Sequence, residues 1–345
     1  MRRHYSLYII PLVLVMLVVC NSSCTNNKPK KSYTPPSVSF SADSAYRYIA
    51  EQVAFGARVP GTAAHRRCYE YLSARLYDCG ARVEIQQGEM TNYAGEKQPI
   101  VNIIAHYGRP TANRKRLLLC AHWDCRPWAD QEENYYERQT PVTGANDGAS
   151  GVGVLLEIAR QLGERQAAIA SNGNNGEMPL VDIVFFDCED MGTPDFYTGK
   201  ELENTWCLGS QLWAERVKNG KTGDGVMPAD YSFGILLDMV GAPGATFPKE
   251  YISMQHAANR VNQVWNKASE LGYGKYFVEQ VCYPITDDHF YVNTIAGIPC
   301  IDIIHYETGS ATGFAPYWHT TRDDMRNIDP ATLDAVGKTI MTIIN

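Results

Sequence analysis

The chain has 345 residues, of which 45% are hydrophobic, and its formal net charge is −7. A chain of this size and composition can bury a substantial hydrophobic core. It contains no basic tract of the kind that contacts phosphates, so we expect no binding to nucleic acid.

The first 24 residues have the pattern of an export signal. Arg2 and Arg3 precede an apolar stretch, 7–20, that is too short to span a membrane comfortably. Small residues then precede Cys24, as at a bacterial lipoprotein cleavage site. We expect residues 1–24 to be a signal peptide that directs the protein to the periplasm. A lipid anchor at Cys24 is slightly favoured, and ordinary cleavage nearby, which would release a soluble protein, is the alternative.

The rest of the chain divides into a short tether and one long folded region. Residues 25–40 are rich in Lys, Pro, Ser and Asn, which is typical of a flexible tether. Residues 41–345 alternate between strand-like and helix-like segments. Eight cysteines occur from Cys68 onward, and none forms a CxxC pair, so we expect no cysteine zinc site. Export permits disulfides, and their pairing stays open.

Hydrophobic periodicity predicts the secondary structure of residues 41–345. Apolar residues recur at helical spacing in several segments, and Gly80 and Gly163 mark two helix ends. The predicted elements in chain order are helices 41–55 and 63–80, strands 101–108 and 116–124, a polar loop 126–143, helix 150–163, a loop 170–179, strand 181–187, a helix around 205–217, strand 233–241, a helix around 257–271, strand 298–306 and a helix around 330–344.

Three of the predicted strands, 181–187, 233–241 and 298–306, are near-continuous apolar runs. Strands of this kind are covered on both faces, as they are in a mostly parallel sheet. The alternation of strands and helices therefore predicts a single α/β domain. Its central sheet is expected to be mixed but mostly parallel, with helices flanking both faces.

Acidic residues and histidines lie at or just after the ends of these strands. Ligands of open α/β sheets bind beyond the carboxyl ends of the strands, and buried carboxylates persist when they are paired or hold a metal. Asp238 lies inside an apolar run, and the adjacent Glu189 and Asp190 repel each other unless a cation intervenes. The candidate groups are His122, Asp124, Asp147, Glu189, Asp190, Asp238, Asp287, Asp288, His289 and His319.

Each candidate also has a purely structural interpretation. Asp147 could be an acid at a helix N-terminus, Asp288 a helix cap, and His319 a packed imidazole beside Trp318. Taken together, however, carboxylates and imidazoles without thiolates suit a catalytic zinc site. Three such ligands would leave a fourth position open for substrate, and a glutamate outside the ligand set could transfer protons.

The motifs that carry these residues resemble a known clan. HWD, GANDGASGV, FFDCED, LLDMVG, TDDHF and WHT occur in the order seen in zinc aminopeptidases that bind two metals, and the resemblance covers residues 45–345. Within that clan, GAPGATFP at 241–248 and the Trp of YWHT are more similar to the glutaminyl cyclases. The Glu-Asp pair at 189–190, where the family usually has Glu-Glu, resembles a bacterial branch of these cyclases.

The resemblance implies a zinc-dependent glutaminyl-peptide cyclotransferase on a zinc aminopeptidase-like fold. Such enzymes convert the N-terminal glutamine of peptides and proteins into pyroglutamate and release ammonia. Carried over by position, Asp147, Asp190 and His319 would hold one Zn²⁺ per chain. The remaining implied roles are Glu189 as general acid and base, Asp238 and Asp288 as a hydrogen-bonded acidic pair, and Trp318, with Phe247 and Phe290 nearby, as the wall of the substrate pocket.

Two alternatives stay open. An exported two-zinc aminopeptidase would use His122, Asp147 and Asp238 for a second zinc, with Asp147 bridging the metals and Glu189 activating water. A non-catalytic ectodomain of the same fold would act by binding alone, but it would be expected to have lost metal ligands. The three zinc positions are all intact.

Overall fold

The computed structural model describes residues 39–345, except residues 112, 172–176, 201 and 224. The predicted signal peptide, Cys24 and nearly all of the predicted tether lie outside the described residues. Within the described residues, no helix has the length and apolar character needed to cross a membrane.

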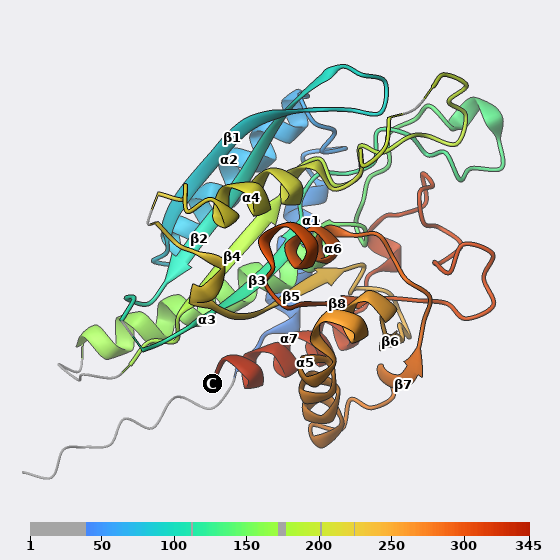
Figure 1. Cartoon of the computed structure of the whole chain (residues 1–345). Helices are drawn as coiled ribbons and strands as arrows, with labels where there is room; N and C mark the ends of the chain where they lie inside the picture. Colours follow the sequence, from blue (N-terminus) through green and yellow to red (C-terminus); the bar gives the residue numbers. More distant parts are fainter. Residues whose placement is uncertain (1–38, 112, 172–176, 201, 224) are drawn as a thin grey trace, which may run out of the picture. The chain divides into compact units, whose positions relative to one another are not determined.

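A six-stranded sheet runs through the molecule in the order β1-β2-β4-β3-β5-β8 (Figure 1). The first two pairings in this order are antiparallel, and β4, β3, β5 and β8 run parallel to one another. The predicted mixed, mostly parallel sheet is therefore confirmed. Its strands are β1 (Arg82–Thr91), β2 (Lys97–Tyr107), β3 (Arg116–His122), β4 (Val181–Phe186), β5 (Tyr231–Asp238) and β8 (Cys300–Ile304); β6 (Phe247–Lys249) and β7 (Phe277–Val281) form a separate parallel pair.

Helices pack on both faces of the sheet, as predicted. One hydrophobic cluster joins the sheet to five of the helices, and a second cluster joins the opposite face to the others. The first face carries α1 (Ala42–Val53), α2 (Ala63–Asp78), α3 (Ala149–Ser171), α5 (Tyr251–Glu270) and α7 (Pro330–Ile344), and the second carries α4 (Leu208–Lys218), α6 (Asp288–Tyr291) and the π-helical turn η3 (Val292–Ala296). Short 3₁₀ turns are η1 (Tyr135–Glu137), η2 (Pro228–Asp230) and η4 (Met325–Asn327).

Local sequence explains where several helices begin. The side chains of Ser41 and Thr62 accept hydrogen bonds from backbone amides in the first turns of α1 and α2. Helix α5 begins earlier than the predicted residue 257, because Glu250 accepts hydrogen bonds from the amides of Ile252 and Ser253. Apolar periodicity could not indicate this capping acid.

Helix α3 lies very close to the sheet. A Cβ atom at Gly151 would lie 2.1 Å from the carbonyl oxygen of Leu237 on β5. Only glycine permits this approach, and it brings the start of α3, with Asp147 just before it, to the end of β5. The eight cysteines from Cys68 onward are all free thiols.

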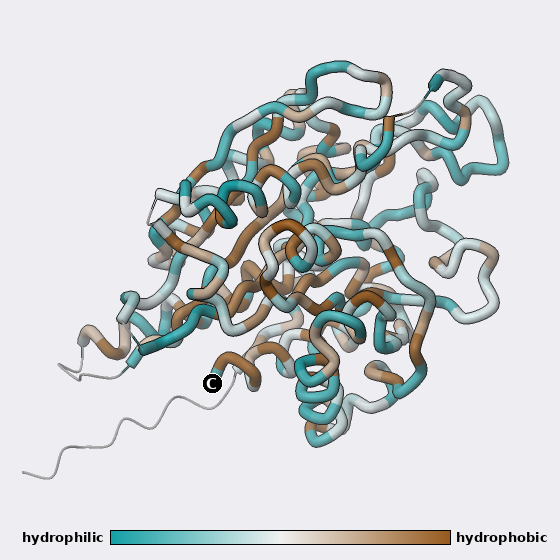
Figure 2. The backbone as a smooth tube through the Cα atoms, viewed as in Figure 1, coloured by the Kyte–Doolittle hydropathy of each residue, from teal (hydrophilic) through white to brown (hydrophobic). Residues whose placement is uncertain are grey.

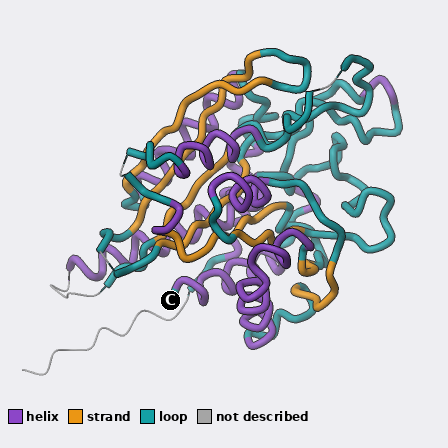
Figure 3. Tube along the Cα trace, in the orientation of Figure 1, coloured by secondary structure: helices purple, strands orange, loops and turns teal. Residues whose placement is uncertain are grey.

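The strands in the centre of the sheet are hydrophobic along their length, as the brown segments of Figure 2 show. β3, β4 and β8 are fully buried, which explains their continuous apolar sequences. The long connecting segments gather on one side of the sheet, at the right of Figure 3. This side includes the carboxyl ends of the parallel strands.

Candidate active site

The parallel strands bring the predicted residues to one edge. His122 and Asp238 end β3 and β5, and Glu189 and Asp190 follow β4. His319 comes from the segment between β8 and α7. Five acids and His319 line one cavity of about 430 Å³; the acids are Asp147, Glu189, Asp190, Asp238 and Asp287.

Three of these side chains form a compact set of metal-binding atoms. The Nε2 atom of His319 lies 3.2 Å from Oδ1 of Asp190 and 3.6 Å from Oδ2 of Asp147. All three residues are buried, and one ligand atom from each lies within 4.8 Å of the others. A donor set of two carboxylates and one imidazole fits a divalent metal such as zinc.

The carboxylate of Asp130 holds His319, one of the three metal-binding residues, on the side away from the cavity. Oδ1 of Asp130 lies 3.5 Å from Nδ1 of His319, which leaves Nε2 facing the cavity. Burial opposes ionisation of Asp130, but hydrogen bonds from His319 and Arg126 keep the pKa of its carboxyl below the ordinary value. The polar loop 126–143 contains many charged residues, and nothing in its sequence distinguishes Asp130 from the rest.

The backbone of the ligand segments is also fixed by carboxylates. Both oxygens of Asp323 accept hydrogen bonds, from the amides of Asn146 and Asp147 at 2.9 and 3.0 Å. Asp124 accepts hydrogen bonds from the amides of Glu189 and Asp190 at 3.1 and 3.3 Å. Asp124 of the HWD motif and Asp323, four residues after His319, thus position the backbone of the residues that face the cavity.

His122 forms a second set that shares Asp147. Its Nε2 atom lies 3.0 Å from Oδ1 of Asp147 and 3.2 Å from Oδ1 of Asp238. Burial would lower the pKa of His122, but the carboxylates of Asp124, Asp147 and Asp238 raise it well above the ordinary value. His122 is therefore suited to be a charged imidazolium between two carboxylates, although the same three groups could also hold a metal.

Glu189 faces the cavity in a poorly compensated environment. Burial raises the pKa of its carboxyl well above the ordinary value, against a smaller opposing effect of His122. One of its oxygens lies 3.1 Å from the thiol of Cys207. Glu189, Cys207 and Asp287 have side-chain atoms within 4.8 Å of one another.

The expected acidic pair was Asp238 and Asp288, but the acid that lines the cavity with Asp238 is Asp287. Asp287 lines the cavity with Asp238, whereas Asp288 is fully buried behind it. The reason is local: Asp287 has extended backbone and caps α6 by accepting a hydrogen bond from the amide of Asp288, and the helix then turns Asp288 inward. A pair of adjacent aspartates in the sequence gives no sign of which one faces the cavity.

Of the aromatic residues expected to form the wall of the pocket, Trp318 lines the cavity and Phe247 does not. Trp318 lines the cavity and stacks on His319, with ring centroids 3.6 Å apart. Phe247 is fully buried in the core, 5.2 Å from Phe277, so its expected place in the pocket is wrong. Phe247 lies in β6, and its carbonyl accepts a hydrogen bond at 3.1 Å from the indole of Trp265 on α5, which packs over it.

Two further aromatic residues, Phe290 and Trp206, also differ from the expected composition of the pocket wall. Phe290, predicted near the pocket, is half-buried on α6, packs against Tyr291, and does not line the cavity. Trp206 does line it, with its ring parallel to His319 at 6.5 Å and the guanidinium of Arg126 4.7 Å from its centroid. The Trp before Cys207 carried no recognised motif in the sequence.

Comparison with known proteins identifies relatives of this arrangement. The model of peptidase family M28 matches residues 102–344. The structure of Tannerella forsythia glutaminyl cyclase is 48% identical, has a TM-score of 0.80, and covers 89% of this chain and 99% of its own. A Zn-dependent exopeptidase from Parabacteroides distasonis is also 48% identical, with a TM-score of 0.80 and coverage of 89% and 98%.

A more distant similarity extends to animals. Bovine glutaminyl-peptide cyclotransferase is 24% identical over 247 residues, which is 68% of this chain and 63% of the bovine protein. The matches to bacterial structures extend over almost the whole of those proteins and support the resemblance that the motifs indicated. The chain therefore belongs to peptidase family M28 and, within it, to the glutaminyl cyclases.

Proposed function

We propose that the protein is a glutaminyl-peptide cyclotransferase that converts the N-terminal glutamine of peptides and proteins into pyroglutamate and releases ammonia. One Zn²⁺ per chain would be held by Asp147, Asp190 and His319. The observation that carries the proposal is the shared cavity: a metal-binding triad and the carboxyl of Glu189 face the same space. Family membership points to the same reaction.

The reaction requires one bond to form and one to break. The α-amine nitrogen attacks the γ-carbonyl carbon of glutamine, and the bond from that carbon to the amide nitrogen breaks. Zinc, when bound, acts as a Lewis acid that polarises the carbonyl and stabilises the developing negative charge. Ring closure is intramolecular, so the cavity mainly has to hold the folded-back substrate in attack geometry.

Glu189 is the group that moves protons in this proposal. Its carboxylate accepts a proton from the attacking amine and then gives one to the departing nitrogen, which leaves as ammonia. Burial raises the pKa of its carboxyl above the ordinary value, which favours an acid that exchanges protons over one that stays an anion. Asp238 and Asp287 lie beside it and would hold the substrate amine, while the ring of Trp318 excludes water from the reacting carbonyl.

A single assay tests the reaction. The purified protein is incubated with a peptide that begins with glutamine, and both ammonia and free glutamine are measured. We expect the assay to detect ammonia and a peptide whose mass is lower by that of ammonia, and to detect no free glutamine. Treatment with a chelator should abolish the reaction, and added zinc should restore it. Release of free glutamine with an otherwise intact peptide would contradict the proposal.

A two-zinc aminopeptidase is the second candidate, because His122, Asp147 and Asp238 also form a metal-binding set. Elemental analysis of the purified protein distinguishes the two: about one zinc per chain supports the cyclase, and about two support the peptidase. A non-catalytic ectodomain would be inactive in both assays.

We also propose that the chain is exported, with residues 1–24 as the signal, Cys24 as the lipid anchor and 25–40 as the tether to the domain 41–345. The sequence pattern before Cys24 supports this. Expression of the full chain, followed by fractionation, should place it with periplasmic or membrane material. Replacement Cys24→Ser should release it from the membrane fraction; if the variant stays there, the lipid anchor is wrong.

A further inference from the structure

A second cavity, of about 720 Å³, lies at the edge of the sheet opposite the candidate active site. Two of its lining residues mark this edge: Arg116 is the first residue of β3, and Met178 shortly precedes β4. The turn between β2 and β3 and the last turns of α3, at the lower left of Figure 1, also contribute to its walls. The two cavities therefore lie at opposite ends of the same parallel strands.

The second cavity is opposite in charge to the first. Four arginines and His106 line it, against the single carboxylate of Glu177, whereas five acids line the first cavity. The carboxyl end of α3 adds only about half an elementary negative charge. An excess of positive charge in one cavity of a chain whose net charge is −7 points to an anionic ligand. The four arginines are Arg82, Arg109, Arg114 and Arg116.

The base of this cavity is a buried polar network. Arg116 and His106 are 3% and 8% exposed, and they lie 2.6 and 2.8 Å from the same carboxylate oxygen of Asp182. The hydroxyl of Tyr231 donates to the other oxygen at 2.7 Å. Asp182 therefore balances the charge of Arg116 and fixes the base. The positive charge that a ligand would meet comes from the arginines of the wall.

Two arginines of the wall have donors suited to a phosphate group. Arg114 lies 3.1 Å from a carboxylate oxygen of Glu177 and donates to the carbonyl of Met178 at 2.7 Å, so its guanidinium is held in place across the segment before β4. Arg109 is exposed, and within the described residues it forms no ion pair. A guanidinium presents parallel N–H donors whose geometry matches the oxygens of a phosphate. The wall thus offers one fixed and one adaptable phosphate-binding group.

The described part of the chain begins close to this cavity. The hydroxyl of Ser39, the first described residue, donates a hydrogen bond to the side chain of Gln161 on α3 at 3.2 Å. Gln166, five residues further along the same helix and so about 7.5 Å away, lines the cavity. The segment 25–38 between Cys24 and Ser39 can reach at most about 50 Å. A chain anchored at Cys24 can therefore bring this cavity to a membrane surface.

We propose that the second cavity binds the phosphate of an anionic lipid headgroup through Arg109 and Arg114, and that the anchored protein faces the membrane with this end. The side chains of Ile169 and Met178 in the same cavity give the apolar part of the lipid a surface to contact. The candidate active site, at the other end of the parallel strands, then lies on the side away from the membrane, where peptides in solution reach it. Headgroup binding does not depend on the cyclase function, and the orientation rests in addition on the proposed anchor at Cys24.

Binding to vesicles tests the site. The full-length protein is mixed at low salt with vesicles of phosphatidylcholine, either alone or with about 30% phosphatidylglycerol, and the bound fraction is measured by sedimentation. A lipid anchor inserts into both kinds of vesicle, so the ratio of the two partition coefficients reports the effect of the headgroup. We expect a ratio of about ten or more, since each basic residue near an anionic surface contributes about fivefold. A protein of net charge −7 without such a site would be repelled by the anionic vesicles, so a ratio of one or less would overturn the proposal.

Variants assign the binding to the cavity. Arg109→Gln and Arg114→Gln should each lower the ratio by about fivefold. Arg66→Gln, at an exposed arginine near the amino end of α2, is the matched control and should leave the ratio unchanged. An equal fall in all three variants would mean that only the overall charge matters, which would overturn the site. Titration calorimetry with inorganic phosphate separates the two sources of a phosphate group: phosphate binding together with a vesicle ratio of one or less would show that the cavity takes free phosphate and that the lipid assignment is wrong.

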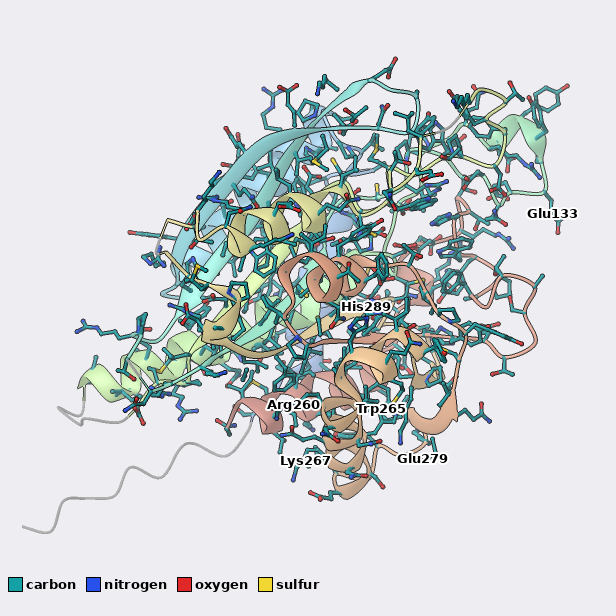
Figure 4. All side chains as sticks on the ribbon, in the orientation of Figure 1. Glu133, Arg260, Trp265, Lys267, Glu279 and His289 are labelled. Atoms are coloured by element: carbon teal, nitrogen blue, oxygen red, sulfur yellow. The ribbon has the colours of Figure 1, made fainter. Side chains whose placement is uncertain are left out.

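A fluorescent label tests the orientation separately. One variant carries the label at Ala167→Cys, an exposed position on α3 beside the cavity, and the other carries it at Glu133→Cys, in the loop 126–143 that Figure 4 labels. Both also carry Cys79→Ala, which removes the half-buried thiol. Lipids with a spin-labelled headgroup should quench the label at position 167 and leave the label at position 133 bright. Equal quenching of the two labels would overturn the orientation.

Discussion

The two ends of strand β4 carry buried acids with opposite behaviour. Asp182, near the start of the strand, accepts hydrogen bonds from Arg116 at 2.6 Å and Tyr231 at 2.7 Å, and lies 2.8 Å from Nδ1 of His106. Glu189 follows the other end. Among the described residues, the side-chain hydrogen bond to its carboxyl comes from the thiol of Cys207.

The pKa values of the two acids move in opposite directions, although Asp182 is fully buried and the side chain of Glu189 is only 12% exposed. Burial would raise the pKa of Asp182, but the hydrogen bond and charge of His106 and the charge of Arg116 lower it. At Glu189 burial raises the pKa and neighbouring charges do not reverse it. The neighbours therefore decide whether such an acid is structural or reactive. An acid whose negative charge is balanced by positive charges and hydrogen bonds stays an anion, whereas an acid without this balance can exchange a proton.

Replacing Glu189, whose negative charge is poorly balanced by its neighbours, should have the largest effect on activity. We expect Glu189→Gln to lower kcat by about 10²- to 10⁴-fold, because the amide cannot accept or deliver the proton. The zinc content should stay the same, since Glu189 is outside the ligand set. Stopped assays with a glutamine-initiated peptide and elemental analysis check the two parts. Normal turnover in this variant would remove Glu189 from the mechanism.

Replacing Asp182, whose negative charge is balanced by its neighbours, should change stability and not activity. Asp182→Asn removes the buried anion that Arg116 and His106 share, so we expect a loss of about 3–5 kcal/mol in the free energy of unfolding. At temperatures where the variant is folded, kcat should be close to wild type. Denaturant titration measures the loss, and Glu164→Gln, at an exposed ion pair with Arg160, is the control that should change it by less than about 0.5 kcal/mol. A fall in kcat with unchanged stability would reverse the assignment.

The sequence was sufficient for the fold and for most of the residues that line the cavity, and the reason is physical. Strands buried on both faces need continuous apolar residues, so an acid such as Asp238 inside such a run stands out. The order of strands in the sheet then places such residues at one edge. Asp182 interrupts an apolar run in the same way, yet its partners come from β2, β3 and β5 and are invisible until the strands pair.

What the sequence could not supply depends on tertiary contacts. Asp130 acquires its role only because a long loop folds back onto His319. The choice between Asp287 and Asp288 depends on where α6 begins. Phe247 belongs to the core because β6 packs under α5, and aromatic residues of a core and of a pocket wall look alike in sequence.

Glu250 is a second buried acid whose charge is balanced by its neighbours, and its effect on stability can be tested by varying the pH. It is fully buried, accepts hydrogen bonds from the amides of Ile252, Ser253 and Ile285, and lies 3.0 Å from Nε2 of His289, which Figure 4 labels beside α6. Burial alone would raise its pKa, but these partners, first of all His289, lower it from 4.5 to about 2.

A lowered folded-state pKa stabilises the fold above the pKa of the unfolded chain, and the contribution is lost as the pH falls from 4.5 towards 2. We expect Glu250→Gln to reduce the free energy of unfolding at pH 7 by about 3 kcal/mol, with the difference from wild type disappearing near pH 2. Thermal unfolding across this pH range measures it. Glu279→Gln, at the exposed residue labelled in Figure 4, is the control; a gap between Glu250→Gln and wild type that stays constant with pH would contradict the assignment.

The smallest expected effect concerns the thiol of Cys207, which donates a hydrogen bond to Glu189. Burial raises the pKa of Cys207 well above the ordinary value, so its thiol stays protonated and donates to the carboxylate. Because a thiol is a weak donor, Cys207→Ala should lower kcat only about two- to fivefold and move the acid limb of the pH profile upward. Cys207→Ser should restore both, and Cys79→Ala, at the half-buried thiol just after the end of α2, should change neither. An unshifted acid limb in Cys207→Ala would mean that the charges around Glu189, among them that of His122, tune its carboxyl without a contribution from the thiol.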